Sequence, residues 1–301
     1  MARKILILGH MGRVEAQRAS LLVIKKLTEA HIVPLMLESE LADLKKCTTE
    51  DLSSVEIFDG NAKPLELIIV LGGDGTILRA AELGKADEIP VLGVNLGHVG
   101  FLAESEKEDL SATTDAVVSK EYAIEDRMCL DVNVYDGKKL KYSDWALNEA
   151  AIEKRSNARM IELAIEVGNE PLVSYGCDGL VMSTPTGSTA YAFSAGGPVM
   201  WPDVEAVMMV PLSAHTLFAK PLVIGPRTQF SVEMLKRNEG TSLIWCDGRR
   251  TFELLPGYRV EVNVSPTKVH LAHLKLAPFT NRLVRKFKLP VDGLRGPDEE
   301  S

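Results

Sequence analysis

The chain begins with a regular alternation of short apolar runs and longer stretches in which apolar residues recur at helical spacing. Continuous apolar runs are typical of strands buried on both faces, and amphipathic stretches between them are typical of crossover helices. This alternation predicts an α/β N-terminal domain with a mostly parallel sheet. Its strands are expected at residues 4–8, 32–37, 55–58, 65–71 and 91–94, and its helices at 14–30, 77–84 and 107–120.

From about residue 122 the pattern changes to short strands in which polar and apolar positions alternate. This spacing predicts a mainly antiparallel β C-terminal domain. The basic, amphipathic stretch 278–287 predicts a packed terminal helix, in a C-terminal segment that returns to the N-terminal domain. The expected domains are residues 1–125 with about 276–301, and residues 126–275. Strands of the second domain are expected at 129–135, 147–152, 160–167, 179–183, 229–235, 242–246, 259–264 and 268–274.

Composition narrows the function classes. A net charge of −8 argues against a nucleic-acid partner, which usually needs a basic surface. No apolar run is long enough to cross a membrane, so no membrane partner is expected. The four cysteines have no C-x-x-C spacing, which argues against a zinc site or a disulfide framework and favours a reducing, cytoplasmic location.

The segment Gly72-Gly73-Asp74-Gly75 follows the most apolar run of the first half and precedes a helical pattern. Glycines on a strand-to-helix turn let phosphate oxygens approach main-chain amides at a helix N-terminus. A carboxylate repels phosphates, so Asp74 suggests a metal ligand or an acceptor for a hydroxyl proton. The alternative is that Asp74 only caps the following helix. Neither the dinucleotide fingerprint G-x-G-x-x-G nor a Walker P-loop is present.

Residues 183–198 form a second unusual segment, rich in hydroxyls and punctuated by glycine. Pro185 biases the preceding residue toward an extended backbone, and Gly187 permits a turn that a side chain would block. Backbone amides and hydroxyls are then expected to converge on one small volume suited to a multi-hydroxyl ligand. Taken alone, an ordinary turn between strands explains the composition equally well.

Taken in order, the motifs Gly72–Thr76, Asn95–Glu104, Asn148-Glu149 and the block from Gly176 through Pro198 resemble the NAD kinases. These enzymes phosphorylate the 2′-hydroxyl of the adenosine ribose of NAD to give NADP. The resemblance covers residues from about 65 to 290. The glycine–aspartate motif is shared with lipid kinases and is weakly specific by itself, whereas the Asn-Leu-Gly and Thr-Pro-Thr-Gly-Ser-Thr-Ala-Tyr blocks are strongly specific together.

The resemblance implies a role for each matching position. Asp74 resembles the general base, and Asn148 and Glu149 resemble the pair that holds the substrate sugar and base. Asp178 matches an aspartate at the nicotinamide end, while Arg249 and His98 stand where this sequence departs from the family or the family varies. The remaining positions implied to bind substrate or nucleotide are Gly72, Gly73, Gly75, Arg79, Asn95, Arg159, Thr186, Thr189, Ala190, Tyr191, Ala192, Phe193 and Ser194.

The resemblance also implies substrates and partners. They are NAD, a phosphoryl donor that is ATP or polyphosphate, Mg²⁺ delivered with the nucleotide rather than held in a protein cage, and a second copy of the chain in a dimer or tetramer. Two other readings stay open on the sequence. One is a lipid kinase acting on diacylglycerol-like substrates, and the other is a sensor that binds NADP without making it.

Overall fold

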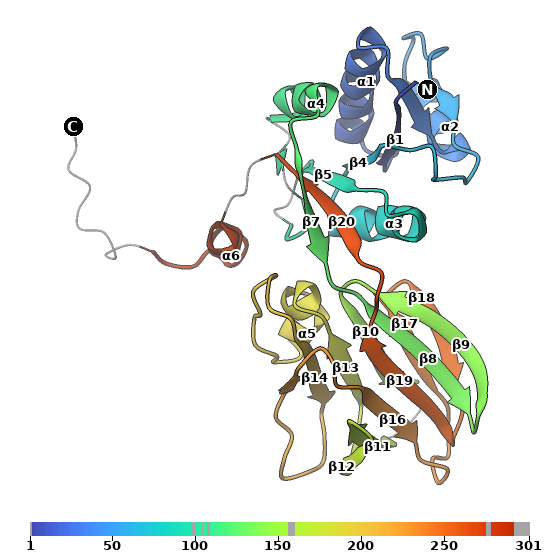
Figure 1. Ribbon diagram of the computed structural model, residues 1–301, viewed down its shortest axis with the longest axis vertical. Helices are drawn as coiled ribbons and strands as arrows, with labels where there is room; N and C mark the ends of the chain where they lie inside the picture. Colours follow the sequence, from blue (N-terminus) through green and yellow to red (C-terminus); the bar gives the residue numbers. More distant parts are fainter. Residues whose placement is uncertain are drawn as a thin grey trace. The chain divides into compact units, whose positions relative to one another are not determined.

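The computed structural model describes residues 2–97, 100–103, 105–106, 109–155, 160–274 and 278–291. The chain divides into two compact units. Unit 1 contains Met1–Asp126 and Val269–Ser301, and unit 2 contains Arg127–Lys268. The chain therefore enters unit 2 once and returns to unit 1 for its last segment, as the sequence predicts (Figure 1).

Unit 1 is built on a mostly parallel sheet, which confirms the expected α/β class. Its strands follow the order β3-β2-β1-β4-β5-β20-β7, with β6 paired to β5. The pairs from β3 to β5 are parallel, because each connection runs back over a face of the sheet. The strands are β1 Lys4–Gly9, β2 Val33–Met36, β3 Glu56–Ile57, β4 Leu67–Leu71, β5 Val91–Asn95, β6 Ser105–Glu106, β7 Ala123–Arg127 and β20 Val269–His273.

The helices of unit 1 cover both faces of this sheet. The helices α1 (Val14–Glu29) and α4 (Leu110–Ser119) pack together on one face, and α3 (Asp74–Gly84) lies on the other (Figure 1). The core residues of β4 are all buried, as its continuous apolar run predicts. Two further helices are α2 (Glu38–Cys47), which the apolar pattern does not predict, and the terminal α6 (Phe279–Phe287).

The sequence places the strand at residues 268–274 in the antiparallel domain, and this prediction is wrong. The strand β20 lies in the sheet of unit 1 and pairs parallel with β5 through Leu271 and Val91. Alternating polarity identifies a strand, but it carries no information about which sheet receives that strand.

Unit 2 consists of two six-stranded sheets in which the neighbouring strands pair antiparallel, again as expected. One sheet has the order β15-β14-β13-β10-β17-β18 and the other β12-β11-β16-β19-β8-β9. Side chains from both sheets form one hydrophobic core, including Ile152, Leu180, Val232 and Ile244. The antiparallel hairpins thus bury one face of each sheet.

The strands of unit 2 are β8 Leu130–Asp136, β9 Lys139–Ala146, β10 Glu149–Lys154, β11 Ile161–Val167, β12 Glu170–Cys177, β13 Gly179–Ser183, β14 Val207–Leu212, β15 Leu222–Ile224, β16 Phe230–Met234, β17 Ser242–Cys246, β18 Arg250–Leu254 and β19 Tyr258–Val264. The sequence pattern does not predict β9, β12, β14, β15 or β18. Four of these five strands lie at sheet edges, where much of each strand is exposed and the apolar alternation is weak.

Two short helical segments follow β13, the 3₁₀ turn Thr186–Thr189 and the single-turn helix α5 (Tyr191–Ser194). Among the described residues, no helix is long and apolar enough to span a bilayer.

Candidate functional site

The first candidate region lies at the carboxyl end of β4, where the chain turns into α3. Gly73 precedes the helix in an extended conformation, and Asp74 is the first helical residue. A Cβ added to Gly73 or Gly75 would meet nothing within 4 Å, so the main chain of this turn is open to an approaching ligand. In a parallel sheet, this edge is where ligands bind. The turn thus offers the exposed amides that an anionic group requires.

The carboxylate of Asp74 does not cap its own helix. Its Oδ2 accepts a hydrogen bond from the amide of Phe101 at 3.0 Å, and its Oδ1 accepts one from the amide of Leu102 at 3.1 Å. A carboxylate offers about four lone-pair sites, so two remain for a substrate hydroxyl. The side chain is half-buried. The capping alternative is therefore wrong, and two backbone amides fix the position of the carboxylate.

Gly100 makes this arrangement possible. A Cβ at that position would lie 2.3 Å from Asp74 Oδ1, far inside contact distance. The next residue is anchored by α6, because the ring of Phe101 packs 6.0 Å from that of Phe279 and 5.7 Å from that of Phe287. The Arg282 guanidinium also donates to the Phe101 carbonyl at 2.9 Å. The terminal helix thus holds the loop that positions Asp74.

Arg79 forms an ion pair with Glu40, a partner that the sequence does not indicate. Its guanidinium donates to Glu40 Oε1 at 2.8 Å, and the other oxygen of Glu40 accepts the amide of Gly9 at 3.1 Å. Burial raises the pKa of Glu40, while the Gly9 amide and Arg79 oppose that rise. Glu40 lies on α2, a helix that the apolar pattern of the sequence does not predict, so the sequence does not indicate this contact. Asn95 is also buried, and its Oδ1 accepts the amide of Gly97 at 3.2 Å, which fixes the turn after β5.

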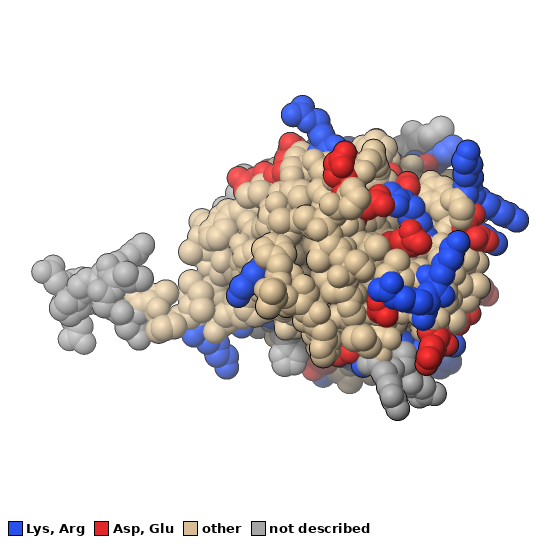
Figure 2. Space-filling model, turned by 90° about the horizontal axis from the view of Figure 1, so that it is seen from below, with Lys and Arg blue, Asp and Glu red and all other residues tan. Residues whose placement is uncertain are grey.

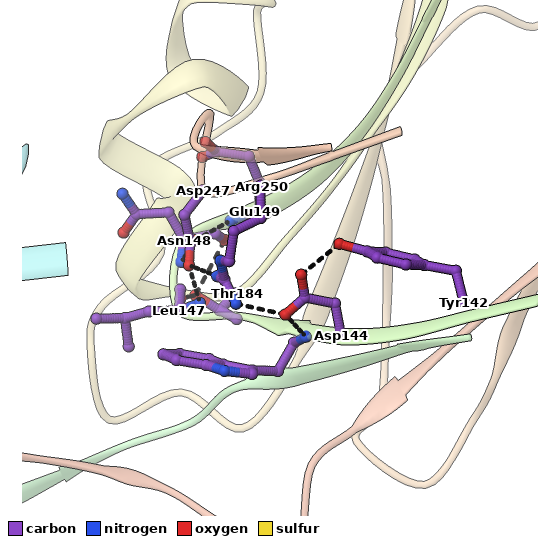
Figure 3. A network of polar contacts seen from close by, with 9 residues as sticks. Tyr142, Asp144, Leu147, Asn148, Glu149, Thr184, Asp247 and Arg250 are labelled. Atoms are coloured by element: carbon purple, nitrogen blue, oxygen red, sulfur yellow. Dashed lines mark hydrogen bonds and ion pairs between the residues drawn. The ribbon is translucent and has the colours of Figure 1, made fainter. Parts of the chain in front are cut away.

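The second candidate region lies in unit 2, where Asn148 and Glu149 join β9 to β10. Their amides, with that of Leu147, point to one carboxylate, Asp247 (Figure 3). The distances are 3.0 Å from Leu147, 2.7 Å from Asn148 and 3.4 Å from Glu149. The side-chain amide of Asn148 points away from this carboxylate (Figure 3). Asp247 therefore holds the backbone and leaves the amide side chain to other contacts.

Glu149 is the most unusual titratable group of this region. Its side chain is buried, and within the described part of the chain its Oε2 has no hydrogen-bond partner. Burial first and the negative charge of Asp247 second raise the pKa of Glu149 from 4.5 to about 8, while the amide of Tyr191 opposes the rise. A buried polar atom without a partner is costly, so this oxygen is suited to a ligand hydroxyl.

The hydroxyl-rich stretch lies against the same segment. Thr184 donates its hydroxyl to the Leu147 carbonyl at 2.5 Å, and its amide donates to the Asn148 carbonyl at 2.9 Å. Gly187 is required here, because a Cβ would lie 2.1 Å from the Asn148 carbonyl oxygen. The fully buried hydroxyls of Ser183 and Ser188 also bond to carbonyls. These hydroxyls therefore build the turn, which corrects the expectation that they converge on a ligand.

Beyond the turn the chain becomes accessible. Thr186 and Ala192 are buried, whereas Thr189 and Ala190 are half-buried and Ser194 is exposed. The exposed rings are Tyr191 and Phe193, 36% and 40% accessible. The Tyr191 hydroxyl donates to Glu153 Oε1 at 2.6 Å, and burial followed by this bond raises the pKa of Tyr191 to about 12. The tyrosine thus presents a fixed aromatic face.

Three expected positions remain. Asp178 pairs with Lys154 at 2.7 Å, and this contact holds the pKa of Asp178 below its usual range. Arg159 and His98 lie outside the described residues. Within the described ranges, no three acidic, histidine or cysteine side chains gather in a way that could hold a metal ion. A single carboxylate such as Asp74 could still contribute one ligand to a hydrated Mg²⁺.

Comparisons with known proteins give one family. Residues 13–122 match the ATP-NAD kinase N-terminal domain, and residues 147–274 match the ATP-NAD kinase C-terminal domain. An NAD kinase of Leifsonia xyli is 52% identical over 298 residues, which cover 98% of each chain. An NAD kinase of Mycobacterium tuberculosis is 45% identical over 303 residues, again with 98% of each chain covered.

Solved structures show the same fold at low identity. Yeast NADH kinase complexed with NADH superposes with a TM-score of 0.88 at 19% identity, covering 96% of this chain and 88% of that chain. An NAD kinase from Archaeoglobus fulgidus in complex with ATP gives a TM-score of 0.71 at 24% identity, covering 96% and 100%.

Proposed function

The chain belongs to the ATP-NAD kinase family, and from that premise we propose that it transfers the terminal phosphoryl group of ATP to the 2′-hydroxyl of the adenosine ribose of NAD. The observation that carries the proposal is the arrangement of Asp74. Its carboxylate lies at the carboxyl end of β4, half-buried, beside exposed main-chain amides, with lone pairs left over after two hydrogen bonds.

In this reaction Asp74 accepts the proton of the ribose hydroxyl as the ribose oxygen bonds to the γ-phosphorus of ATP and the bond from that phosphorus to the bridging oxygen breaks, which releases ADP. A ribose hydroxyl is a weak nucleophile at neutral pH, and a positioned base contributes about 10²- to 10⁴-fold. The open amides at Gly73 and Gly75 bind phosphoryl oxygens. Arg79 is held by Glu40 and adds a positive charge from the same helix. These groups align and neutralise the transferred group, which is most of what phosphoryl transfer requires.

Asn148 and Glu149 hold the sugar and base of the dinucleotide. The partnerless Oε2 of Glu149 accepts a ribose hydroxyl, which removes the cost of leaving that atom unpaired. The exposed ring of Tyr191 stacks on a base, and the accessible main chain of residues 189–194 lies along the ligand. Asp178 and Thr186 belong to the same proposed binding region, and a contact of Arg159 with the ligand stays an expectation from the family resemblance.

Mg²⁺ bound to the nucleotide would neutralise charge on the phosphates and help to orient them. Among the described residues, no three acidic, histidine or cysteine side chains lie together as a metal cage. In this proposal the ion arrives with the nucleotide and keeps several of its waters.

The test is a matrix of donors and acceptors. Purified protein is incubated with NAD or NADH and with MgATP or polyphosphate, and the products are separated by chromatography. We expect NADP from NAD and MgATP. A protein that binds NADP but forms none in any combination would be the sensor, and phosphorylation of diacylglycerol in vesicles would identify the lipid kinase.

We also propose that the chain forms a homo-oligomer through unit 2. One face of the molecule has a wide area with few charged side chains (Figure 2). Five large apolar side chains are exposed in the segment 201–223, which reaches the edge strand β15, namely Trp201, Val204, Leu217, Phe218 and Val223. Such surfaces often bind another protein chain. Light scattering should give a dimer or tetramer for the native chain and a smaller species for Phe218→Asp.

A cytoplasmic location is the last part of the proposal. The four cysteines are thiols rather than disulfides, and three of them are buried. Cysteines kept as thiols are typical of a reducing compartment.

A further inference from the structure

Asp247 is a carboxylate enclosed by donors. It lies in the turn between β17 and β18, where Asp247 has a φ of +53° and Gly248 a φ of +63°. Its Oδ1 accepts the amides of Asn148 and Glu149, and its Oδ2 accepts that of Leu147. These three residues are consecutive, and they lie 98 to 100 positions earlier in the chain.

Arg250 completes the enclosure and connects it to a second acid. Its Nη2 donates to Asp247 Oδ2 at 2.9 Å, and its Nη1 donates to Asp144 Oδ1 (Figure 3). Asp144 also accepts the amide of Trp145 at 2.8 Å and the hydroxyl of Tyr142. The guanidinium lies over the Trp145 ring at 4.6 Å. One planar fork thus joins two acids and is itself fixed by an aromatic face.

The lone pairs of Asp247 are all engaged. With about two sites on each oxygen, the two amides on Oδ1 and the amide and guanidinium on Oδ2 fill them. The side chain is only 2% exposed. Asp247 therefore has nothing left to offer a ligand, and any influence it has on ligand binding must pass through the backbone that it holds.

We propose that Asp247, fixed by Arg250 and Asp144, is a positioning residue that sets the direction in which Asn148 and Glu149 meet the dinucleotide. This inference rests on the proposed function. The bonds end on the two amides of the ligand-binding pair itself, so a change at Asp247 alters the φ and ψ angles from which both side chains project. Burial raises the pKa of Asp247, and the amides and Arg250 oppose that rise. The negative charge of Asp247 in turn raises the pKa of Glu149, so Asp247 acts on the pair through its charge as well as through its hydrogen bonds.

The main test is Asp247→Asn. The new amide nitrogen is a donor and faces either an amide or the guanidinium, so one side of the enclosure becomes repulsive. We expect the KM for NAD to rise about tenfold, equivalent to ~1.4 kcal/mol of lost binding. The KM for MgATP should stay within about twofold. The matched control is Asp136→Asn, which removes an exposed acid paired with Lys141 at 3.4 Å in the same unit.

A thermodynamic cycle separates positioning from plain stability. If Asp247 acts through Glu149, the effect of Asp247→Asn on NADP affinity, measured by calorimetry, should shrink at least threefold when Glu149→Gln is already present. Full additivity would overturn the proposal, and so would an unchanged KM for NAD in a folded variant. Arg250→Lys is the second variant, because a lysine cannot bridge both acids. It should raise the same KM about threefold, and an equal rise for both substrates would count against positioning.

The two proposals fail in different ways. Wild-type protein that makes no NADP contradicts the proposed function, and NADP affinity alone then decides the role of Asp247. Wild-type protein that makes NADP while Asp247→Asn keeps its affinity contradicts only the positioning role.

Discussion

Both candidate regions combine a carboxylate with backbone amides, but the supporting group in one region is the supported group in the other. In unit 1 the proposed functional group is the carboxylate of Asp74, and the supporting groups are the amides of Phe101 and Leu102. In unit 2 the carboxylate of Asp247 is the support, and the supported amides belong to the segment that we propose binds the ligand. Backbone amides and carboxylates are thus complementary, and either one can position the other.

The exchange leaves opposite kinds of acid available for chemistry. Asp74 is half-buried and each of its oxygens accepts one backbone amide, so the carboxylate is held in place without help from a ligand. Glu149 is buried with an unpaired oxygen, so it holds its proton until a partner arrives. A group that is ready in the free protein suits proton transfer. One that is incomplete in the free protein suits recognition, because binding then satisfies it.

The sharpest test of this contrast is Asp74→Asn. The amide side chain keeps the shape but cannot take a proton, so turnover should fall at least ~100-fold. NADP affinity should change by less than about threefold, because recognition is assigned to the other region. Steady-state kinetics and calorimetry on one preparation measure both quantities. Turnover like that of the wild type would remove Asp74 from the base role.

Gly100→Ala should produce the next largest effect. The added Cβ would lie 2.3 Å from Asp74 Oδ1, so the carboxylate or the loop must move. We expect kcat to fall by about tenfold or more, since small displacements of catalytic groups are costly. Gly240→Ala is the matched control, because its Cβ would meet nothing within 4 Å. Equal activity in the two variants would show that activity does not depend on the exact position of the Asp74 carboxylate.

The local parts of this contrast could be predicted from the sequence, and the long-range parts could not. The apolar run before Gly72 and the helical pattern after Asp74 are neighbours in the chain, so the strand, the turn and the helix are encoded together. The amides that hold Asp74 come from residues 27 and 28 positions later. Nothing in a sequence pattern of short period records such a partner.

Unit 2 shows the same limit more strongly. The Asn148-Glu149 pair could be found by its resemblance to a family, but its support, Asp247, lies about a hundred residues away. The Asp-Gly pair at 247–248 indicates a hairpin turn and does not indicate what the aspartate binds. Helix α2, which supplies Glu40 to Arg79, was missed because its apolar positions are few and its surface is charged.

The raised pKa of Glu149 gives a third prediction, on stability. The folded-state pKa of about 8 lies above the ordinary value of 4.5 that applies to the unfolded chain. The unfolded state therefore releases its proton first, and the folded state loses stability as pH rises from about 4.5 to 8. Glu149→Gln removes this loss. Its unfolding temperature should match that of the wild type near pH 4 and exceed it by about 3 °C or more above pH 8.

The comparison in this experiment is with Glu170→Gln, an exposed position on the edge strand β12. That variant should follow the wild type at every pH in a thermal unfolding series. A Glu149→Gln curve parallel to both would mean that Glu149 is ionised and paired in solution, and the two regions would then differ less than proposed.

The smallest effect concerns Tyr191, whose exposed ring lies next to the candidate region of unit 2 that contains Asn148 and Glu149. We call this part of unit 2 the recognition region. The backbone amide of Tyr191 donates to Glu149, and its hydroxyl donates to Glu153. Glu153 lies four residues after Glu149 on β10, on the same face of the strand. Tyr191→Ala keeps the amide and removes the ring, so the KM for NAD should rise about fivefold through lost stacking. Tyr191→Phe keeps the ring and releases only the Glu153 contact, and the KM should stay within about twofold because that bond is exposed. If the two variants raise the KM equally, the hydroxyl orients the ligand and the ring does not. The recognition region would then depend on a second fixed polar group, as the Asp74 region depends on its amides.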